Sequence, residues 1–350
     1  SALAAPSRGA AVPRAPLRAE RPRGPPAVRP VLDAAGMTRP ADSDVTRDMV
    51  WIPGAKYLMG SDTDYPEERP AHPVEVDGFF LDHHPVTNAE FRRFAEATGH
   101  VTFAELAPKA EDYPDAKPEL LVPGSAVFFP SSRPVPLGDC SAWWQYVPGA
   151  DWRHPEGPES SIEGREDHPV VHVAYADVEA YARWAGKALP TEAEWELAAR
   201  GGLDGAPFAW GDELHPGGAM MANTWQGEFP WQNLLLDGYE RTSPVGAFPP
   251  NGYGLVDMIG NVWEWTCDWF APRHEAPRRP CCAPLNPRGG SLAGSIDARL
   301  GTRLPRKVLK GGSFLCAPSY CRRYRPAARI PETVDTTTCH VGFRCVVRPG

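Results

Sequence analysis

The sequence predicts an α+β protein made of a single irregular, loop-rich domain. The 350 residues include 33 Gly and 41 Pro, which favour turns and long connections over long regular helices. Helical periodicity is confined to short segments between residues 87 and 200, whereas strand-like runs and loops fill the rest. The apolar fraction of 42% and the 12 Trp are sufficient for a core. No repeat or low-complexity break divides residues 46–348, so we expect one domain there.

Residues 1–45 are predicted to be a disordered tail. They are rich in Ala, Pro and Arg and contain few aromatic or β-branched residues, so they bury too little surface to offset the entropy of ordering. Residues 1–36, which precede Met37, are expected to be an extension without a functional role.

Charge and composition exclude several classes of protein. The net charge is −8 although residues 1–40 are basic, so the rest of the chain is strongly acidic. An acidic body disfavours nucleic acid as a partner, because phosphate binding needs a basic face. No run of 18 apolar residues is present, and we expect a soluble protein that does not enter a membrane. Eight cysteines in this length are too few for a small disulfide scaffold.

The first elements are three strands and a helix. Residues 49–54 and 57–60 read as strands around a turn, and residues 74–81 alternate as a third strand. Thr87 and Glu90 have the spacing of a capping box, which opens a helix over residues 88–95 that Gly99 ends. Residues 104–140, rich in Pro and Asp, are expected to form a long surface excursion.

Two more helices follow. Residues 175–184 have an amphipathic pattern and end before Gly186. Thr191 and Glu194 form a second predicted capping box, which opens a helix that runs to residue 200 before Gly201. Residues 203–350 show hardly any helical periodicity, so irregular strands and loops are expected there.

The strongest local signal for chemistry is the segment 311–325, GGSFLCAPSYCRRYR. Cys316 and Cys321 are five positions apart, and Pro318 bends the chain between them. Two thiolates suit a soft ion such as Cu(I). Three arginines follow, and they would favour thiolate over thiol (Arg322, Arg323 and Arg325). Spacing alone also allows a disulfide or two unrelated thiols.

Several tracts accompany this segment in a fixed order. They are residues 189–196 (LPTEAEWE), 225–230 (WQGEFP), 248–255 (FPPNGYGL), 260–265 (GNVWEW) and 341–344 (VGFR). Together they resemble the sulfatase-modifying factor family over about residues 49–347. This resemblance implies an elaborated C-type-lectin-like fold. The cysteine pair and residues 152–158 (WRHPEGP) match the branch of formylglycine-generating enzymes.

The resemblance implies a copper-dependent oxidase. Such an enzyme converts the cysteine of a Cys-X-Pro-X-Arg motif in sulfatases to Cα-formylglycine with molecular oxygen and a thiol reductant. Cys316 and Cys321 would hold Cu(I), and the cysteine of the modified polypeptide, here called the client, would add a third sulfur. Residues that would line this pocket are Ser313, Trp263 and Tyr320. Considered individually, they also fit a turn hydroxyl and two core aromatics.

His340 stands where many members of the family carry Asn. A histidine there would still donate a hydrogen bond in the oxygen pocket. It could also titrate or bind a metal ion.

Two structural Ca²⁺ sites are also implied. The first would use the side chains of Asn223 and Asp237 and the carbonyls of Thr224 and Tyr239. The second would use the side chains of Asp257 and Glu264 and the carbonyls of Gly260 and Val262. Mixed oxygen ligands on loops suit calcium. The alternative is that these are turn-forming residues.

The other cysteines bear on the cellular compartment in which the protein acts, because disulfide bonds form in oxidising compartments. Cys345 aligns with a position that is disulfide-bonded in secreted relatives, but Ala182 occupies the partner position. The second bridge of those relatives is replaced by Ala199 and Pro326. The resemblance therefore implies a reducing, bacterial cytoplasmic location. Cys281 and Cys282 are expected to lie in an unreactive surface loop.

Clients of the family are unfolded or nascent sulfatase polypeptides, so an open groove beside the thiol pair is expected. The client arginine needs a carboxylate, and the candidates are Glu67, Glu68, Glu105 and Asp112. Candidates for the groove wall are Trp143, Trp144 and Trp152, with core packing as the alternative. We expect a monomer.

Three other functions compete with this hypothesis. A non-haem iron sulfoxide synthase has a related fold, but its iron-binding helix motif, His-x-x-x-His-Glu, is not found in this sequence. A lectin-like calcium-binding module would not need both Cys316 and Cys321. A zinc site is the third alternative, with Cys339 and His340 completing four ligands.

Overall fold

A computed structural model of the chain describes residues 44–113, 116–275, 283–300 and 303–349, all of which belong to one compact unit. Residues 1–43 of the predicted tail lie outside the described residues, as do Cys281 and Cys282. In the described part, no helix has both the length and the apolar character needed to cross a membrane.

A four-stranded sheet carries the loop that contains Cys316 and Cys321. Its order is β10 (Val341–Gly342), β7 (Trp263–Trp269), β8 (Arg306–Lys310) and β9 (Arg329–Thr333). β8 is antiparallel to both neighbours, and β10 is parallel to β7. Because residues 311–325 follow β8 directly, the centre of this sheet fixes where that loop starts.

Two smaller sheets form the N-terminal part of the unit. β1 (Met49–Ile52) and β11 (Val346–Val347) flank β4 (Phe79–Asp82) in an antiparallel sheet. β2 (Ala55–Met59) pairs with β3 (His72–Val76). The last strand of the chain therefore closes against one of the first.

The predicted third strand over residues 74–81 is wrong in one respect, because it is two strands. β3 ends at Val76 and β4 begins at Phe79, so Asp77 and Gly78 lie between two different sheets. A Cβ atom on Gly78 would lie 2.4 Å from the ring of Trp51. Only glycine allows this close approach.

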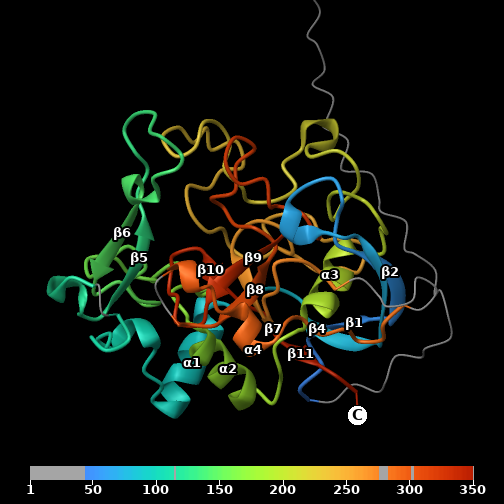
Figure 1. Cartoon of the computed structure of the whole chain (residues 1–350), viewed down its shortest axis with the longest axis horizontal. Coiled ribbons are helices and arrows are strands. Elements are labelled where there is room, and N and C mark those ends of the chain that lie inside the picture. Colours follow the sequence, from blue (N-terminus) through green and yellow to red (C-terminus); the bar gives the residue numbers. More distant parts are fainter. Residues whose placement is uncertain (1–43, 114–115, 276–282, 301–302, 350) are drawn as a thin grey trace, which may run out of the picture. The chain divides into compact units, whose positions relative to one another are not determined.

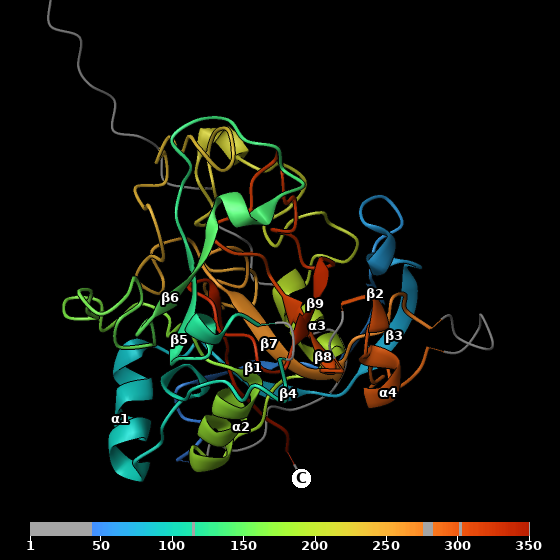
Figure 2. The same cartoon turned by 60° about the vertical axis from the view of Figure 1, so that its left-hand side comes forward.

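The three predicted helices are confirmed. They are α1 (Asn88–Thr98), α2 (Tyr175–Trp184) and α3 (Glu192–Arg200). Thr87 and Thr191 form the expected capping boxes, which satisfy amides that a helix N-terminus leaves unpaired. α1 and α2 lie side by side (Figure 2). α3 contacts β2, β3, β7 and β8, so it covers the central sheet.

The predicted surface excursion over residues 104–140 contains more structure than expected. β5 (Gly124–Phe128) pairs with β6 (Trp144–Pro148) in an antiparallel ribbon (Figure 1). One further short helix, α4 (Leu292–Ser295), precedes β8. The described 3₁₀ turns are Pro66–Glu68, Phe103–Glu105, Pro118–Leu120, Cys140–Ala142, Pro216–Gly218 and Ala298–Leu300.

Two hydrophobic clusters meet at the loop that follows β8. The larger contains Trp152, Trp195, Trp265 and Cys316. The smaller contains aromatic residues from β5 and from the loops around it, together with Leu315 and Ala317. Since neighbouring residues of one loop enter different clusters, packing on both sides fixes the loop.

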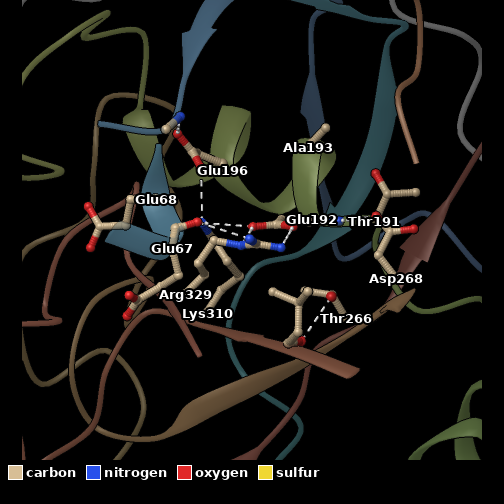
Figure 3. Close-up of polar contacts among 12 residues, drawn as sticks. Glu67, Glu68, Thr191, Glu192, Ala193, Glu196, Thr266, Asp268, Lys310 and Arg329 are labelled. Carbon is tan, nitrogen blue, oxygen red and sulfur yellow. Dashed lines mark hydrogen bonds and ion pairs between the residues drawn. The ribbon is translucent and has the colours of Figure 1, made fainter. Parts of the chain in front are cut away.

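A buried network of charges ties α3 to the central sheet (Figure 3). Lys310 Nζ lies 2.9 Å from Glu196 Oε2 and 3.7 Å from Glu192 Oε1. Arg329 donates to both oxygens of Glu192, at 2.7 and 3.0 Å. Buried charges are tolerated when they are paired in this way.

Candidate active site

Cys316 and Cys321 meet in the loop that follows β8. Their Sγ atoms lie 3.2 Å apart, and both cysteines are free. The backbone brings them together through two turns, in which the amide of Cys316 donates to Ser313 O and the amide of Cys321 donates to Ala317 O, each at 2.9 Å. Two converging sulfur atoms form a donor pair that suits a soft monovalent cation.

Distant tracts of the sequence brace this loop. The amide of Phe314 donates to Asn261 O at 3.0 Å, and the amide of Trp225 donates to Cys316 O at 3.1 Å. Gly312 has a φ of 76°, and a Cβ atom there would lie 2.9 Å from a main-chain oxygen. The tracts 225–230 and 260–265 therefore hold the thiol loop in shape.

The two thiols have different acidities. Burial raises the pKa of Cys316, which also donates a hydrogen bond to Cys321. That hydrogen bond and the guanidinium of Arg323 lower the pKa of Cys321 to about 7. Arg323 Nη1 lies 4.0 Å from Cys321 Sγ, and its Nη2 donates to Glu67 Oε1 at 2.6 Å. Cys321 therefore loses its proton at a lower pH than Cys316.

Only one of the three neighbouring arginines contacts the pair. Arg322 is exposed, and Arg325 is buried against Glu68, to which its Nη1 donates at 2.8 Å. Arg323 is held by Glu67 and by the ring of Tyr65, 3.7 Å below its guanidinium carbon. The pairing of Glu67 with Arg323 has no local sequence signal, because the two residues are 256 positions apart.

The pair is accessible from one side. Cys316 is 1% exposed, whereas Cys321 is partly exposed and Tyr320 is 39% exposed. The ring of Tyr320 stacks on Phe229 with centroids 4.5 Å apart and an interplanar angle of 3°. A polypeptide would thus approach the sulfur atoms from the side of Cys321 and Tyr320.

The three tryptophans predicted to line a groove have different roles. Trp152 is fully buried and packs edge-on against Phe91 in the main core. Trp143 is also buried, but its ring contacts the edge of Tyr320. Trp144 is partly exposed. Core packing therefore describes Trp152, and only Trp144 presents surface.

Ser313 belongs to the thiol loop itself. It is fully buried, its amide donates to Cys316 Sγ at 3.4 Å and its Oγ accepts from the amide of Leu315 at 3.3 Å. The hydroxyl thus stabilises the turn, which is the alternative that the sequence left open.

Trp263 and His340 are joined through their backbones. The amide of Trp263, which is 2% exposed, donates to His340 O at 2.9 Å. The imidazole of His340 lies against Trp144, and its Nδ1 is 2.7 Å from Thr338 Oγ1. Burial lowers the pKa of His340 to about 3, so this ring is neutral at neutral pH.

The candidate carboxylates for a client arginine are reduced to three. Glu68 is fully buried and already paired, so it is excluded. Glu67 is paired with Arg323, and Glu105 lies 2.7 Å from Arg153. Asp112 is exposed.

The first set of predicted calcium ligands contains one buried oxygen that accepts no hydrogen bond from the described residues. Asn223 is 1% exposed, and its Oδ1 has no hydrogen-bond partner within the described residues. Asp237 accepts from the amides of Tyr239 and Thr224, at 3.0 and 3.2 Å, and burial raises its pKa. Asp237 also accepts from Gln226 Nε2 at 2.6 Å, so within this set it is the free oxygen of Asn223 that fits a hard cation such as calcium.

The second set offers fewer free oxygens. Glu264 Oε2 accepts from Trp195 Nε1 at 2.7 Å and from Arg344 Nε at 2.8 Å, and Oε1 accepts from Arg344 Nη2 at 2.7 Å. Asp257 is 7% exposed, and burial raises its pKa. Glu264 therefore retains one free acceptor position at most, on Oε1.

The four side chains of the zinc alternative do not form a metal site in the described residues. Across the ranges that the structure describes, no three side chains of His, Cys, Asp or Glu are placed to share a metal ion. Cys339 instead accepts a hydrogen bond from the amide of Phe128, at 3.3 Å, inside the smaller cluster.

Comparison with known proteins identifies the family. The profile of the sulfatase-modifying factor enzyme 1-like domain matches residues 35–349. The chain belongs to this family. Within it, the formylglycine-generating enzyme of Mycobacterium tuberculosis is 54% identical over 304 residues, which cover 86% of this chain and 98% of that protein. The formylglycine-generating enzyme of Streptomyces coelicolor is 47% identical over 306 residues, 86% of this chain and 89% of that protein.

The fold is shared with solved relatives. The structure of PvdO from Pseudomonas aeruginosa aligns with a TM-score of 0.56 and 25% identity, covering 89% of this chain and 99% of that one. The family match and this alignment confirm the predicted α+β, C-type-lectin-like fold.

The family also contains a protein named as inactive. The inactive Cα-formylglycine-generating enzyme 2 of mouse is 37% identical over 310 residues, which cover 86% of each chain. Membership of the family therefore does not decide activity, which has to be argued from the site.

Proposed function

We propose that this protein converts the cysteine of a Cys-X-Pro-X-Arg motif in a sulfatase polypeptide to Cα-formylglycine. The observation that carries the proposal is the pair of free thiols, 3.2 Å apart, of which one is partly exposed. The two bacterial relatives that match most of the chain are formylglycine-generating enzymes, which supports the same reaction.

The reaction replaces a thiol with an aldehyde. One client thiol, one molecule of oxygen, two electrons and two protons give one aldehyde, one hydrogen sulfide and one water, and a thiol reductant supplies the electrons. Protein side chains alone provide no redox centre for oxygen, so a cofactor is needed. Cu(I) held by Cys316 and Cys321 would supply oxygen activation at the site.

The residues around the pair have separate tasks. The partly exposed Cys321 forms a thiolate more readily than Cys316, because the hydrogen bond from Cys316 and the guanidinium of Arg323 lower its pKa. Cys316 keeps its sulfur away from water. Tyr320, stacked on Phe229, gives the incoming polypeptide a rigid apolar wall.

Mass spectrometry tests the proposed reaction. A peptide with the Cys-X-Pro-X-Arg motif is incubated with the copper-loaded protein, oxygen and a thiol reductant, and conversion of thiol to aldehyde is followed as a loss of mass. Cys316→Ser and Cys321→Ser should each lower turnover by orders of magnitude. Cys140→Ser, which changes an exposed free cysteine outside the pair, should retain it. Full turnover in both pair variants would refute the proposal.

We also propose a structural role for calcium at Asn223 and Asp237. The unmatched Oδ1 of Asn223 supports it. The set around Asp257 and Glu264 has weaker support, because Arg344 already occupies most of the Glu264 carboxylate. Calcium should raise the thermal unfolding temperature of the wild type by mass action, and Asn223→Ala should reduce that response.

A reducing compartment is consistent with the described cysteines. All six of them are free, including the buried Cys345. We therefore propose that the protein acts in the cytoplasm, where thiols stay reduced.

A further inference from the structure

A cavity of about 200 Å³ lies beside the segment 231–236, apart from the thiol pair. Its apolar walls are Phe128, Pro130, Trp225, Trp231 and Leu235, and its polar ones are Asn233, Glu240 and Arg241. An apolar cavity of about 150 Å³ in another protein binds benzene. This cavity therefore has room for one large apolar side chain.

The segment 231–236, from which Trp231 and Leu235 line the cavity, exposes several apolar side chains. Trp231 is 36% exposed, and the three consecutive leucines are 51%, 44% and 66% exposed (Leu234, Leu235 and Leu236). Contiguous exposed apolar residues mark interaction sites more often than plain surface. Exposure of these apolar side chains to water is unfavourable, so a binding partner that covers them would stabilise the segment.

The backbone holds this run in a strained conformation. Leu235 has a φ of 51°, in the left-handed region that a leucine rarely adopts. The amide of Leu235 donates to Asn233 Oδ1 at 3.2 Å, which fixes the turn. Strain that is retained in this way is concentrated at functional sites.

The wall of the cavity contains a donor without an acceptor. Trp225 is 3% exposed, and its indole Nε1 has no hydrogen-bond partner in the part of the chain that the structure describes. A buried unpaired N–H group is costly, and a peptide carbonyl that reached Nε1 would satisfy it. A polypeptide supplies both an apolar side chain and such carbonyls.

One layer of aromatic rings separates the cavity from the thiol pair. The ring of Trp225 packs against Phe229 with centroids 5.3 Å apart, and Phe229 stacks on Tyr320. The amide of Trp225 also donates to Cys316 O. A polypeptide bound at Cys321 and Tyr320 therefore passes close to the cavity.

On the basis of the proposed function, we propose that this cavity is a second binding site for the client. It takes one large apolar side chain, such as Leu or Phe, from an extended part of the client outside the Cys-X-Pro-X-Arg motif. An unfolded polypeptide exposes such side chains, whereas a folded one buries them. The site thus favours clients that have not yet folded.

Binding of paired peptides tests this second site without any turnover. Two labelled peptides carry the same motif with its cysteine replaced by serine. One has Leu and Phe in its flanking segments, and the other has Ser at those positions. In fluorescence anisotropy the wild type should bind the apolar peptide about tenfold more tightly, as expected for burial of one side chain.

Two variants and a matched control test whether the apolar peptide binds in this cavity. The ratio of the two dissociation constants should fall from about ten to about one in Leu235→Ser and in Trp231→Ser. Leu292→Ser, which changes a leucine of α4 that is also 51% exposed, should keep the ratio of the wild type.

Two results would overturn the second site. The first is an equal affinity of the wild type for both peptides. The second is a dimer in sedimentation that Leu235→Ser converts to monomers, because a second copy would then occupy the cavity. Since serine peptides are not converted, a failure of the proposed reaction appears only in the mass-spectrometric assay.

Discussion

At the scale of single residues, Arg323 acts together with the hydrogen bond from Cys316 to favour the charged form of Cys321. Its guanidinium lies 4.0 Å from the sulfur atom and helps to lower the pKa of Cys321 to about 7. Arg323→Gln removes the cation, so the pKa should rise and the thiolate should form only at higher pH. The rate of alkylation of Cys321 by iodoacetamide in metal-free protein, measured against pH, reports this midpoint.

The neighbouring arginine provides the control for this experiment. Arg322 is exposed, so Arg322→Gln should leave the midpoint near the wild-type value. An unchanged midpoint in Arg323→Gln would show that the hydrogen bond from Cys316 alone sets the acidity of Cys321.

The sequence predicts the thiol pair better than its surroundings. Cys316 and Cys321 are five positions apart, so one short loop brings them together. Glu67 and Tyr65 reach the same place from the other end of the chain, and no local pattern indicates it. The sequence indicates Glu67 only as one of four candidates for a client arginine, and the folded chain shows that its partner is Arg323.

At the scale of elements, the contact between α3 and β8 depends on a buried lysine. Lys310 is fully buried and lies 2.9 Å from Glu196. Lys310→Met removes one partner and leaves carboxylates with less compensation in the interior. We expect a loss of about 3 kcal/mol in the free energy of unfolding, measured by urea denaturation.

An exposed ion pair on α2 provides the comparison for this loss of stability. Arg183 and Glu179 lie 3.7 Å apart on α2, with side chains 70% and 49% exposed. Arg183→Met should change the free energy of unfolding by less than about 0.5 kcal/mol. Equal effects of the two substitutions would contradict a stabilising role for the buried network.

Helix starts are more predictable than strand partners. A capping box needs only two residues three positions apart, so Thr87 and Thr191 are recognisable in the sequence. The division between β3 and β4 depends on Trp51, which fills the space above Gly78. Periodicity within one strand carries no information about that contact.

At the scale of the whole molecule, three histidines with lowered pKa values make stability depend on pH. Burial lowers the pKa of His172 and of His274 to about 4, and that of His340 to about 3. At these three histidines the unfolded chain therefore binds more protons than the folded one below about pH 6.5. Their contribution to the free energy of unfolding should fall as the pH falls from 6.5 towards 4.

One substitution isolates a single histidine in this profile. His340→Asn removes one titrating group, so the decrease in the free energy of unfolding between pH 7 and pH 5 should be smaller by about 2 kcal/mol. Urea denaturation at both pH values measures it. Identical decreases in the wild type and the variant would mean that His340 titrates normally.

From the unequal exposure of the two sulfur atoms we also expect a particular response to peroxide, in the following order. An oxidant arriving from solvent meets Cys321 first and converts it to a sulfenic acid. The thiol of Cys316 lies within contact distance, so the two condense to a disulfide with loss of water. Cellular thiols reverse that bond, whereas a solitary cysteine would proceed to irreversible sulfinic acid.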